Sequence, residues 1–290
     1  MATLAMIRRE RAIQTGTTSD RSLLRTFLER DRRYAAYAIC DLEDREFART
    51  RWGVAWADDE PIAVAMEYTG LTPQPLFLIG RTDGLEAILD EVLRPRAAYL
   101  AALPDALPAV QAHYRVDAGP PMVRMWVDRP SFSPIAGDFQ RLVPGEIGEL
   151  NRLYQLGFAS WLPAAAIADG VYYGIRAGGK LIAAAGTHVI SPTARLAVLG
   201  NVLTQVEQRG RGYATAVTSA VTEELLGFCD EVVLNVRSDN PPALQAYRRL
   251  GYIEHIRFEE RLVHRLGPPW SGLATSLRRL FAPHKETPSR

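Results

Sequence analysis

Hydrophobic and polar positions in the second half of the chain follow two periods, which together predict a mixed α/β fold. Apolar residues recur at helical spacing over 147–158 and over 214–228. Residues 171–190 read as two strands that an Ala-Gly-Gly turn joins into a hairpin. Further strands are predicted over 195–206, 231–236 and 254–265. A helix is predicted before the last strand, with Asn240 as its N-cap and Gly251 just past its end.

The first half repeats this order of elements, which indicates an internal duplication. A helix is predicted over 21–31 and a hairpin over 51–68, with its turn at Asp58 and Asp59. There follow a strand over 75–81, a helix over 83–93, a strand over 96–103 and a helix, turn and strand over 104–129.

The boundary between the two copies is predicted in 129–138, which is rich in proline and small residues. We expect an N-terminal domain over 1–130, a second domain over 139–266, and a short helix with a polar tail over 267–290. The expected fold class is α/β with a mixed sheet, built as two similar domains in tandem.

Composition and charge narrow the classes of function. The 290 residues are 47% hydrophobic and 23% charged, as in a soluble globular protein, and the net charge of +1 disfavours nucleic-acid binding. The two cysteines show neither a disulfide framework nor metal-ligand spacing, which fits a reducing cytosol. No stretch has the length and apolarity of a transmembrane helix. We therefore expect a cytoplasmic protein that binds no membrane and no metal.

The segment 208–216, QRGRGYATA, places two glycines between a predicted strand and a predicted helix. Such a turn directs backbone N–H groups outward at the positive end of the helix dipole, which is a cradle for phosphate. The third glycine of a dinucleotide fingerprint is missing after Gly210 and Gly212, and no Lys-Ser or Lys-Thr pair of a P-loop follows. The pattern R-x-x-G-x-A remains, formed by Arg209, Gly212 and Ala214.

This pattern resembles the acyl-CoA pyrophosphate signature of the GNAT acetyltransferases. A second motif of that family, N-x-x-A-x-x-x-Y-x-x-x-G-F/Y, is matched by Asn240, Ala243, Tyr247, Gly251 and Tyr252. The resemblance covers 139–266 by motif and the first half by element order, and 200–217 is similar to the FR47-like branch. It implies two GNAT-like domains in tandem. The first carries Gly80 and Gly84 where the signature should be, so we expect it to have lost CoA binding and to shape the acceptor pocket.

The resemblance also implies where acyl-CoA binds, namely between the third and fourth strands of the second copy. The backbone of Leu203 and Thr204 would pair with the pantetheine arm. The remaining binding residues implied by the family are Arg209, Gly210, Arg211, Gly212, Tyr213, Ala214, Asn240, Ala243 and Tyr247. Asn240 has an alternative role as the N-cap of its helix.

Tyr247 is the candidate general acid, because a phenol can protonate the departing CoA thiolate. In the alternative interpretation, Tyr247 only packs against its own helix face. The general base is less defined. Many relatives carry a glutamate near the place of Val198, which cannot accept a proton. His188 on the neighbouring strand has a suitable pKa but could equally be structural.

Glu146 and Asp239 are weaker candidates for the base, and water could carry the proton instead. Cys229 has no His/Asp partner pattern that would make it a nucleophile. The sequence thus predicts an N-acyltransferase that moves acetyl from acetyl-CoA, or another acyl group, to an amine of a small molecule or peptide. A non-catalytic acyl-CoA-binding regulatory module is the alternative. The acceptor is not specified, and a homodimer is left open.

Overall fold

The computed structural model of the chain describes residues 13–155 and 162–267, which form helices on both faces of a sheet. The helices are α1 (Arg21–Leu28), α2 (Ala36–Cys40), α3 (Asp44–Phe47), α4 (Thr82–Glu91), α5 (Leu107–Gln111), α6 (Ile147–Tyr154), α7 (Ala164–Asp169), α8 (Tyr213–Leu225) and α9 (Pro241–Arg249). Short 3-10 helices are η1 (Glu29–Asp31), η2 (Pro104–Ala106), η3 (Pro144–Glu146) and η4 (Val206–Gln208).

The strands are β1 (Gln14–Thr17), β2 (Thr50–Ala57), β3 (Glu60–Tyr68), β4 (Gln74–Gly80), β5 (Ala97–Ala102), β6 (Tyr114–Val116), β7 (Met122–Asp128), β8 (Gln140–Arg141), β9 (Tyr172–Ala177), β10 (Lys180–Ser191), β11 (Leu196–Thr204), β12 (Glu231–Arg237) and β13 (Ile253–Arg265). They form one sheet in the order β1-β2-β3-β4-β5-β13-β7-β12-β11-β10-β9-β8, with β6 also paired to β13. The pairs β4–β5 and β11–β12 are parallel, and the other pairs are antiparallel. The expected mixed α/β fold is confirmed.

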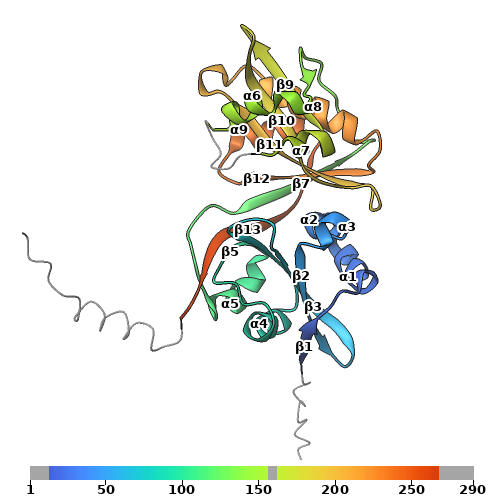
Figure 1. Cartoon of the computed structure of the whole chain (residues 1–290), viewed down its shortest axis with the longest axis vertical. Helices are drawn as coiled ribbons and strands as arrows, with labels where there is room; N and C mark the ends of the chain where they lie inside the picture. The colour runs from blue at the N-terminus through green and yellow to red at the C-terminus, as the bar shows by residue number, and fades with distance from the viewer. Residues whose placement is uncertain (1–12, 156–161, 268–290) are drawn as a thin grey trace, which may run out of the picture.

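The two halves of the sheet exchange strands at the centre of the molecule. Strand β7 belongs to the first copy by sequence, yet it lies between β12 and the first part of β13. The second part of β13, residues 259–264, pairs with β5 of the first copy. Figure 1 shows β13 running from one half into the other. Each half of the sheet is therefore completed by a strand from the other copy.

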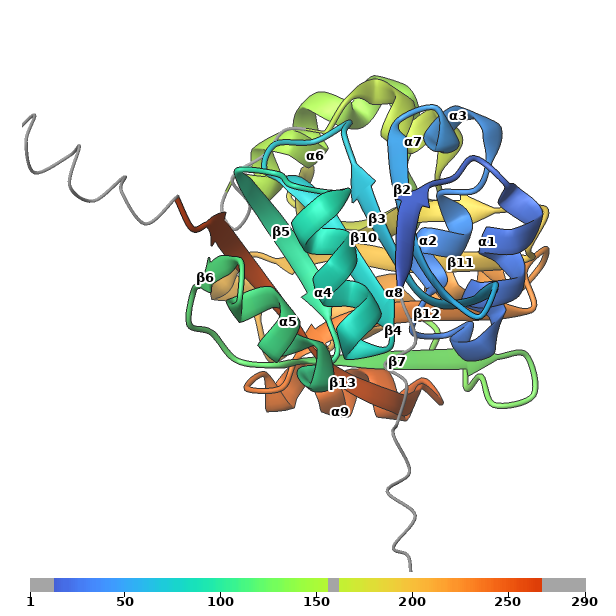
Figure 2. The same cartoon turned by 90° about the horizontal axis from the view of Figure 1, so that it is seen from below.

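Helices α1 and α2 lie between the two halves of the sheet, whereas α4 and α5 cover the opposite face of the first half (Figure 2). The buried residues at this junction come from both copies, for example Leu24 and Ile39 from the first and Val198 and Val233 from the second. The carboxylate of Glu231 also pairs with guanidinium groups of the first copy. The junction is thus a shared hydrophobic core.

Most predicted elements are confirmed, including both hairpins and the helix capped by Asn240. Asp58 and Asp59 have φ of 54° and 65°, as the predicted turn requires. The elements that sequence patterns missed are short: β1, α2, α3, β6, β8 and α7. Residues 156–158 of the predicted 147–158 helix, and 268–290 of the predicted tail, lie outside the described residues. The domain limits stay a prediction. Within the described residues, no helix is long and apolar enough to cross a bilayer.

Asp41, at the end of α2, provides a test of this junction. Its side chain is 6% exposed, and no described residue gives its carboxylate a hydrogen bond or ion pair. Burial, with a smaller contribution from the charge of Glu46, raises the pKa of Asp41 to about 8. The folded state thus keeps a proton that the unfolded chain releases near pH 4, so stability falls as the pH rises toward 8.

We expect Asp41→Asn, which imitates the protonated acid, to be more stable than wild type at pH 9 and to lose this advantage at pH 4. Thermal melting of both proteins at pH 4, 6, 8 and 9 checks this. A difference in melting temperature that is the same at every pH would contradict the buried, unpaired carboxylate.

Candidate functional site

Strands β11 and β12 part in the middle of the second half of the sheet. Their parallel pairing ends at Leu199 and Leu234, although β11 continues to Thr204 and β12 to Arg237. Asn201 has φ of 53°, and the β10–β11 register shifts beside it. This bulge redirects the end of β11 away from β12. We call the opening between the two strand ends the splay.

One edge of β11 directs its backbone groups away from β10 and toward the splay. The N–H of Gln205 donates to the carbonyl of Ile182 on β10 at 2.9 Å. Backbone N–H and C=O groups alternate in direction along a strand. Those of Leu203 therefore also point toward β10, and those of Thr204 point toward the splay. The Thr204 carbonyl accepts a bond from Nε of Arg209 at 3.3 Å. Leu203 and Thr204 are both predicted to pair with pantetheine, and only Thr204 directs its backbone groups toward the splay.

The glycine turn lies at the end of the splay and leads into α8. Gly210 and Gly212 have φ of 77° and 80°, in the left-handed region that favours glycine. A Cβ on either would meet no atom within 4 Å, so the outer side of the turn is open. Within the described residues, the N–H groups of 210–214 donate no hydrogen bond. Arg209 and Arg211 are exposed beside them. These features fit a diphosphate.

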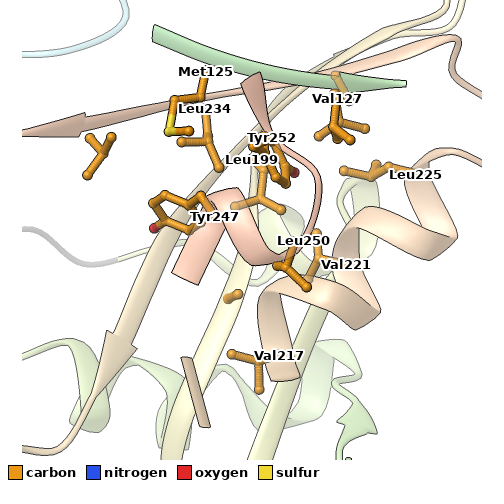
Figure 3. Close-up of a cluster of buried hydrophobic side chains, with 14 of the residues drawn as sticks. Met125, Val127, Leu199, Val217, Val221, Leu225, Leu234, Tyr247, Leu250 and Tyr252 are labelled. Carbon is orange, nitrogen blue, oxygen red and sulfur yellow. The ribbon is translucent and has the colours of Figure 1, made fainter. Parts of the chain in front are cut away.

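Helix α9 carries the second motif. The side chain of Asn240 accepts a bond from the N–H of Ala243 at 3.3 Å, so this asparagine caps the helix. Tyr247 lies one turn beyond Ala243 and is 8% exposed, and burial raises its pKa to about 12. No described residue bonds to its hydroxyl. In Figure 3 the Tyr247 oxygen points away from the surrounding aliphatic side chains and from Tyr252. A proton donor is therefore available at this face of the sheet.

His188 lies on the other face of the sheet. A Cβ on Gly200 would come within 2.3 Å of the imidazole Nε2, so the ring lies directly over Gly200. Gly200 is the first residue of β11 after its pairing with β12 ends. The ring contacts Asn201 Oδ1 at 3.1 Å and the hydroxyl of Tyr37, which belongs to α2 of the first copy. The His188 side chain reaches solvent, although protein atoms surround much of its ring. Burial lowers its pKa, and the bond to Asn201 opposes that shift.

The weaker base candidates are engaged elsewhere. Glu146 accepts bonds from the N–H of Val143 and from Arg176, and Asp239 accepts from Arg237 at 2.9 Å. Val198 is fully buried. Burial raises the pKa of Cys229 to about 11, so its thiol stays protonated at neutral pH. The described residues contain no cluster of His, Cys, Asp and Glu suited to a metal ion.

Sequence reasoning missed Tyr37 and Asn201. A polar residue inside an apolar strand, as in VLGNVL, was a visible signal for Asn201. Tyr37 gave no signal, because only the packing of the first copy onto the second brings α2 to His188.

The first copy has a splay of its own, and a tyrosine hydroxyl bridges its two strands. Pairing of β4 and β5 ends at Phe77 and Ala101. The hydroxyl of Tyr34, a fully buried residue, donates to the carbonyl of Leu78 at 2.9 Å and lies 3.5 Å from that of Ala101. The hydroxyl of Tyr34 therefore bridges the two strand ends at the place that corresponds to the splay of the second copy, and its side chain lines an open pocket there.

Comparison with known proteins identifies the architecture. Residues 172–262 match the family model of the FR47-like proteins, while no curated protein matches the chain. A GCN5-related N-acetyltransferase from Sphaerobacter thermophilus superposes with a TM-score of 0.60 at 16% identity, covering 88% of this chain and 96% of its own. The fold is that of the GNAT acetyltransferases.

Two further structures extend this GNAT assignment. A tandem GNAT protein from the clavulanic acid biosynthesis pathway gives a TM-score of 0.52 at 12% identity, over 89% of this chain and 99% of that one. A GCN5-related N-acetyltransferase from Kribbella flavida gives 0.52 at 17%, over 71% and 87%. The resemblance to tandem GNAT proteins with an FR47-like second half is confirmed. The individual site residues stay predictions.

The glycine turn can be tested with a matched pair of variants. Asparagine and aspartate are nearly isosteric and tolerate a positive φ better than other side chains, so Gly212→Asn and Gly212→Asp differ chiefly in charge. We expect the aspartate to abolish CoA binding by repelling the phosphates, and the asparagine to weaken it much less. Calorimetric titration with CoA at fixed ionic strength measures both. Equal affinities would refute the assignment of this turn.

The first copy predicts how many CoA molecules the chain binds. Because strand carbonyls at its splay already bond to Tyr34, and the R-x-x-G-x-A turn is missing there, we expect one CoA bound per chain at saturation. Equilibrium dialysis with labelled acetyl-CoA gives the number directly, and two sites per chain would show that the first copy still binds.

Proposed function

We propose that this protein transfers an acyl group, most simply acetyl from acetyl-CoA, to a primary amine of a small molecule or peptide. The observation that carries the proposal is the splay with three features around it. The open glycine turn lies at its end, His188 lies over one face, and the hydroxyl of Tyr247 is free on the opposite face. The turn would bind the diphosphate, and the free edge of β11 at Thr204 would align the pantetheine arm.

The two candidate catalytic side chains lie on opposite faces of the sheet and act on different atoms. An amine that approaches on the His188 face forms the C–N bond to the thioester carbon, and the C–S bond then breaks with its electron pair going to sulfur. Tyr247 on the far face gives its proton to that sulfur. His188, held neutral because burial lowers its pKa, takes the proton that the nitrogen loses. Holding both reactants across the sheet supplies the rest of the rate enhancement.

A binding module without catalysis would need the diphosphate cradle alone. The free Tyr247 hydroxyl and the exposed imidazole at the splay have no use in such a module, so they favour the enzyme. A screen for release of free CoA thiol from acetyl-CoA, with amino acids, peptides, aromatic amines and polyamines as acceptors, tests the proposal. CoA binding without thiol release for any of these acceptors would favour the module.

Tyr247→Phe separates catalysis from packing, since it keeps the ring and removes the exchangeable proton. We expect kcat to fall about 10²- to 10⁴-fold, while CoA affinity hardly changes because the hydroxyl acts as charge develops on sulfur. Tyr252→Phe is the matched control. That ring lies 6.0 Å from Tyr247, but its hydroxyl bonds to Thr222 at 2.8 Å. The control should lose stability and keep its kcat. Full activity of a folded Tyr247→Phe protein would remove Tyr247 from the mechanism.

A further inference from the structure

We propose that Tyr37 of the first copy is a catalytic residue of the second, and that it passes the proton of the acceptor amine to His188. This inference rests on the proposed acyl transfer. It assigns the degenerate copy a chemical part in the reaction, in addition to supporting the site.

A chain of hydrogen bonds fixes which imidazole nitrogen carries the proton. The hydroxyl of Tyr172 donates to the carbonyl of Thr187 at 2.8 Å, so it can only accept from Nδ2 of Asn201 at 3.1 Å. This orients Asn201, whose Oδ1 then faces His188 Nε2 at 3.1 Å. An amide oxygen accepts only, so Nε2 must carry the hydrogen. The lone pair of Nδ1 is left to accept from Tyr37 O–H.

Asn201 is itself held in place. Its φ of 53° belongs to the bulge that opens the splay, and its carbonyl accepts from the hydroxyl of Tyr154 at 2.6 Å. The same residue therefore shapes the splay and sets the tautomer of His188. Such a coupling keeps the basic nitrogen directed at Tyr37 whenever the splay is formed.

The surroundings keep Tyr37 and His188 in the states that a relay requires. Burial raises the pKa of the Tyr37 phenol above its usual range, with the carboxylates of Glu260 and Asp41 adding to the shift and Arg124 opposing it. The phenol is therefore protonated at neutral pH. Burial lowers the pKa of His188, so the imidazole is neutral there. Tyr37 is half-buried and His188 exposed, so a molecule from solvent can reach the pair.

The proposed step moves two protons in one direction. Once the amine nitrogen has bonded to the thioester carbon, its proton passes to the Tyr37 oxygen as the phenolic proton passes to His188 Nδ1. Tyr37 ends the step neutral and His188 ends it as imidazolium, which later returns its proton to solvent. The thiolate receives its own proton from Tyr247, so no charge is left on the product or on CoA, and the Tyr247 phenolate then takes a proton from solvent.

The test compares Tyr37→Phe, His188→Gln and the double variant in the thiol-release assay, with kcat/KM measured from pH 5 to 9. In wild type, activity should fall on the acid side, at a lower pH than for an ordinary histidine, because burial lowers the pKa of His188. Each single variant should lose about 10²-fold in kcat and lose this acid limb. The double variant should be no slower than the slower single variant, because the two residues act as a unit. Additive losses, or an acid limb that persists in Tyr37→Phe, would overturn the relay.

Tyr34→Phe is the matched control, because it removes a buried tyrosine hydroxyl of the same copy that lies outside the site. It should lower the melting temperature and leave kcat unchanged. A second measurement needs no activity. Long-range ¹H–¹⁵N NMR of wild type at pH 8, with His188 assigned from the Gln variant, should show hydrogen on Nε2 and an accepting Nδ1. The opposite tautomer would refute the relay, whereas an inactive wild type with the expected tautomer would refute only the proposed acyl transfer.

Discussion

The exchange of β7 and β13 between the two copies is the constraint on which the other features depend. Because each strand completes the sheet of the opposite copy, neither half has a full set of backbone hydrogen bonds alone. The exchange fixes the angle between the halves and brings α2 against β10 and β11. The contact between Tyr37 and His188 is a result of that placement. A tandem protein joined only by a linker would not hold two side chains at hydrogen-bonding distance.

The exchange also has a consequence for folding. Residues 259–264 of β13, near the end of the described chain, pair with β5, whose residues precede them by more than one hundred and fifty positions. During synthesis the edge of β5 thus stays without this partner until residues 259–264 have been made. Such long-range pairing slows folding and leaves a strand edge open to other chains. We expect either copy expressed alone to aggregate.

The sequence allowed the fold class and the second-copy elements to be predicted because they depend on local signals. Alternation, helical spacing, the Asn240 cap and the paired glycines all act within a few residues. The strand exchange could not be predicted in this way, since β7 reads the same whichever copy it joins. The site shows the same limit. Gly210 and Gly212 predict a phosphate-binding turn from local sequence alone. Tyr37, the partner of His188, lies far away in the sequence and belongs to no motif.

Tyr34 makes a CoA site in the first copy difficult to build by mutation. Its ring is fully buried and its carbonyl accepts a bond from the buried guanidinium of Arg124 at 2.8 Å. Truncating such a side chain costs about 3–5 kcal/mol, a large part of the stability of an ordinary domain. Adding a glycine turn alone would give a phosphate cradle beside strand ends that Tyr34 still bridges, while removing Tyr34 first would weaken the junction on which the second copy depends. A variant that gained such a site would first have to pass through a less stable protein, so the junction itself resists a second CoA site.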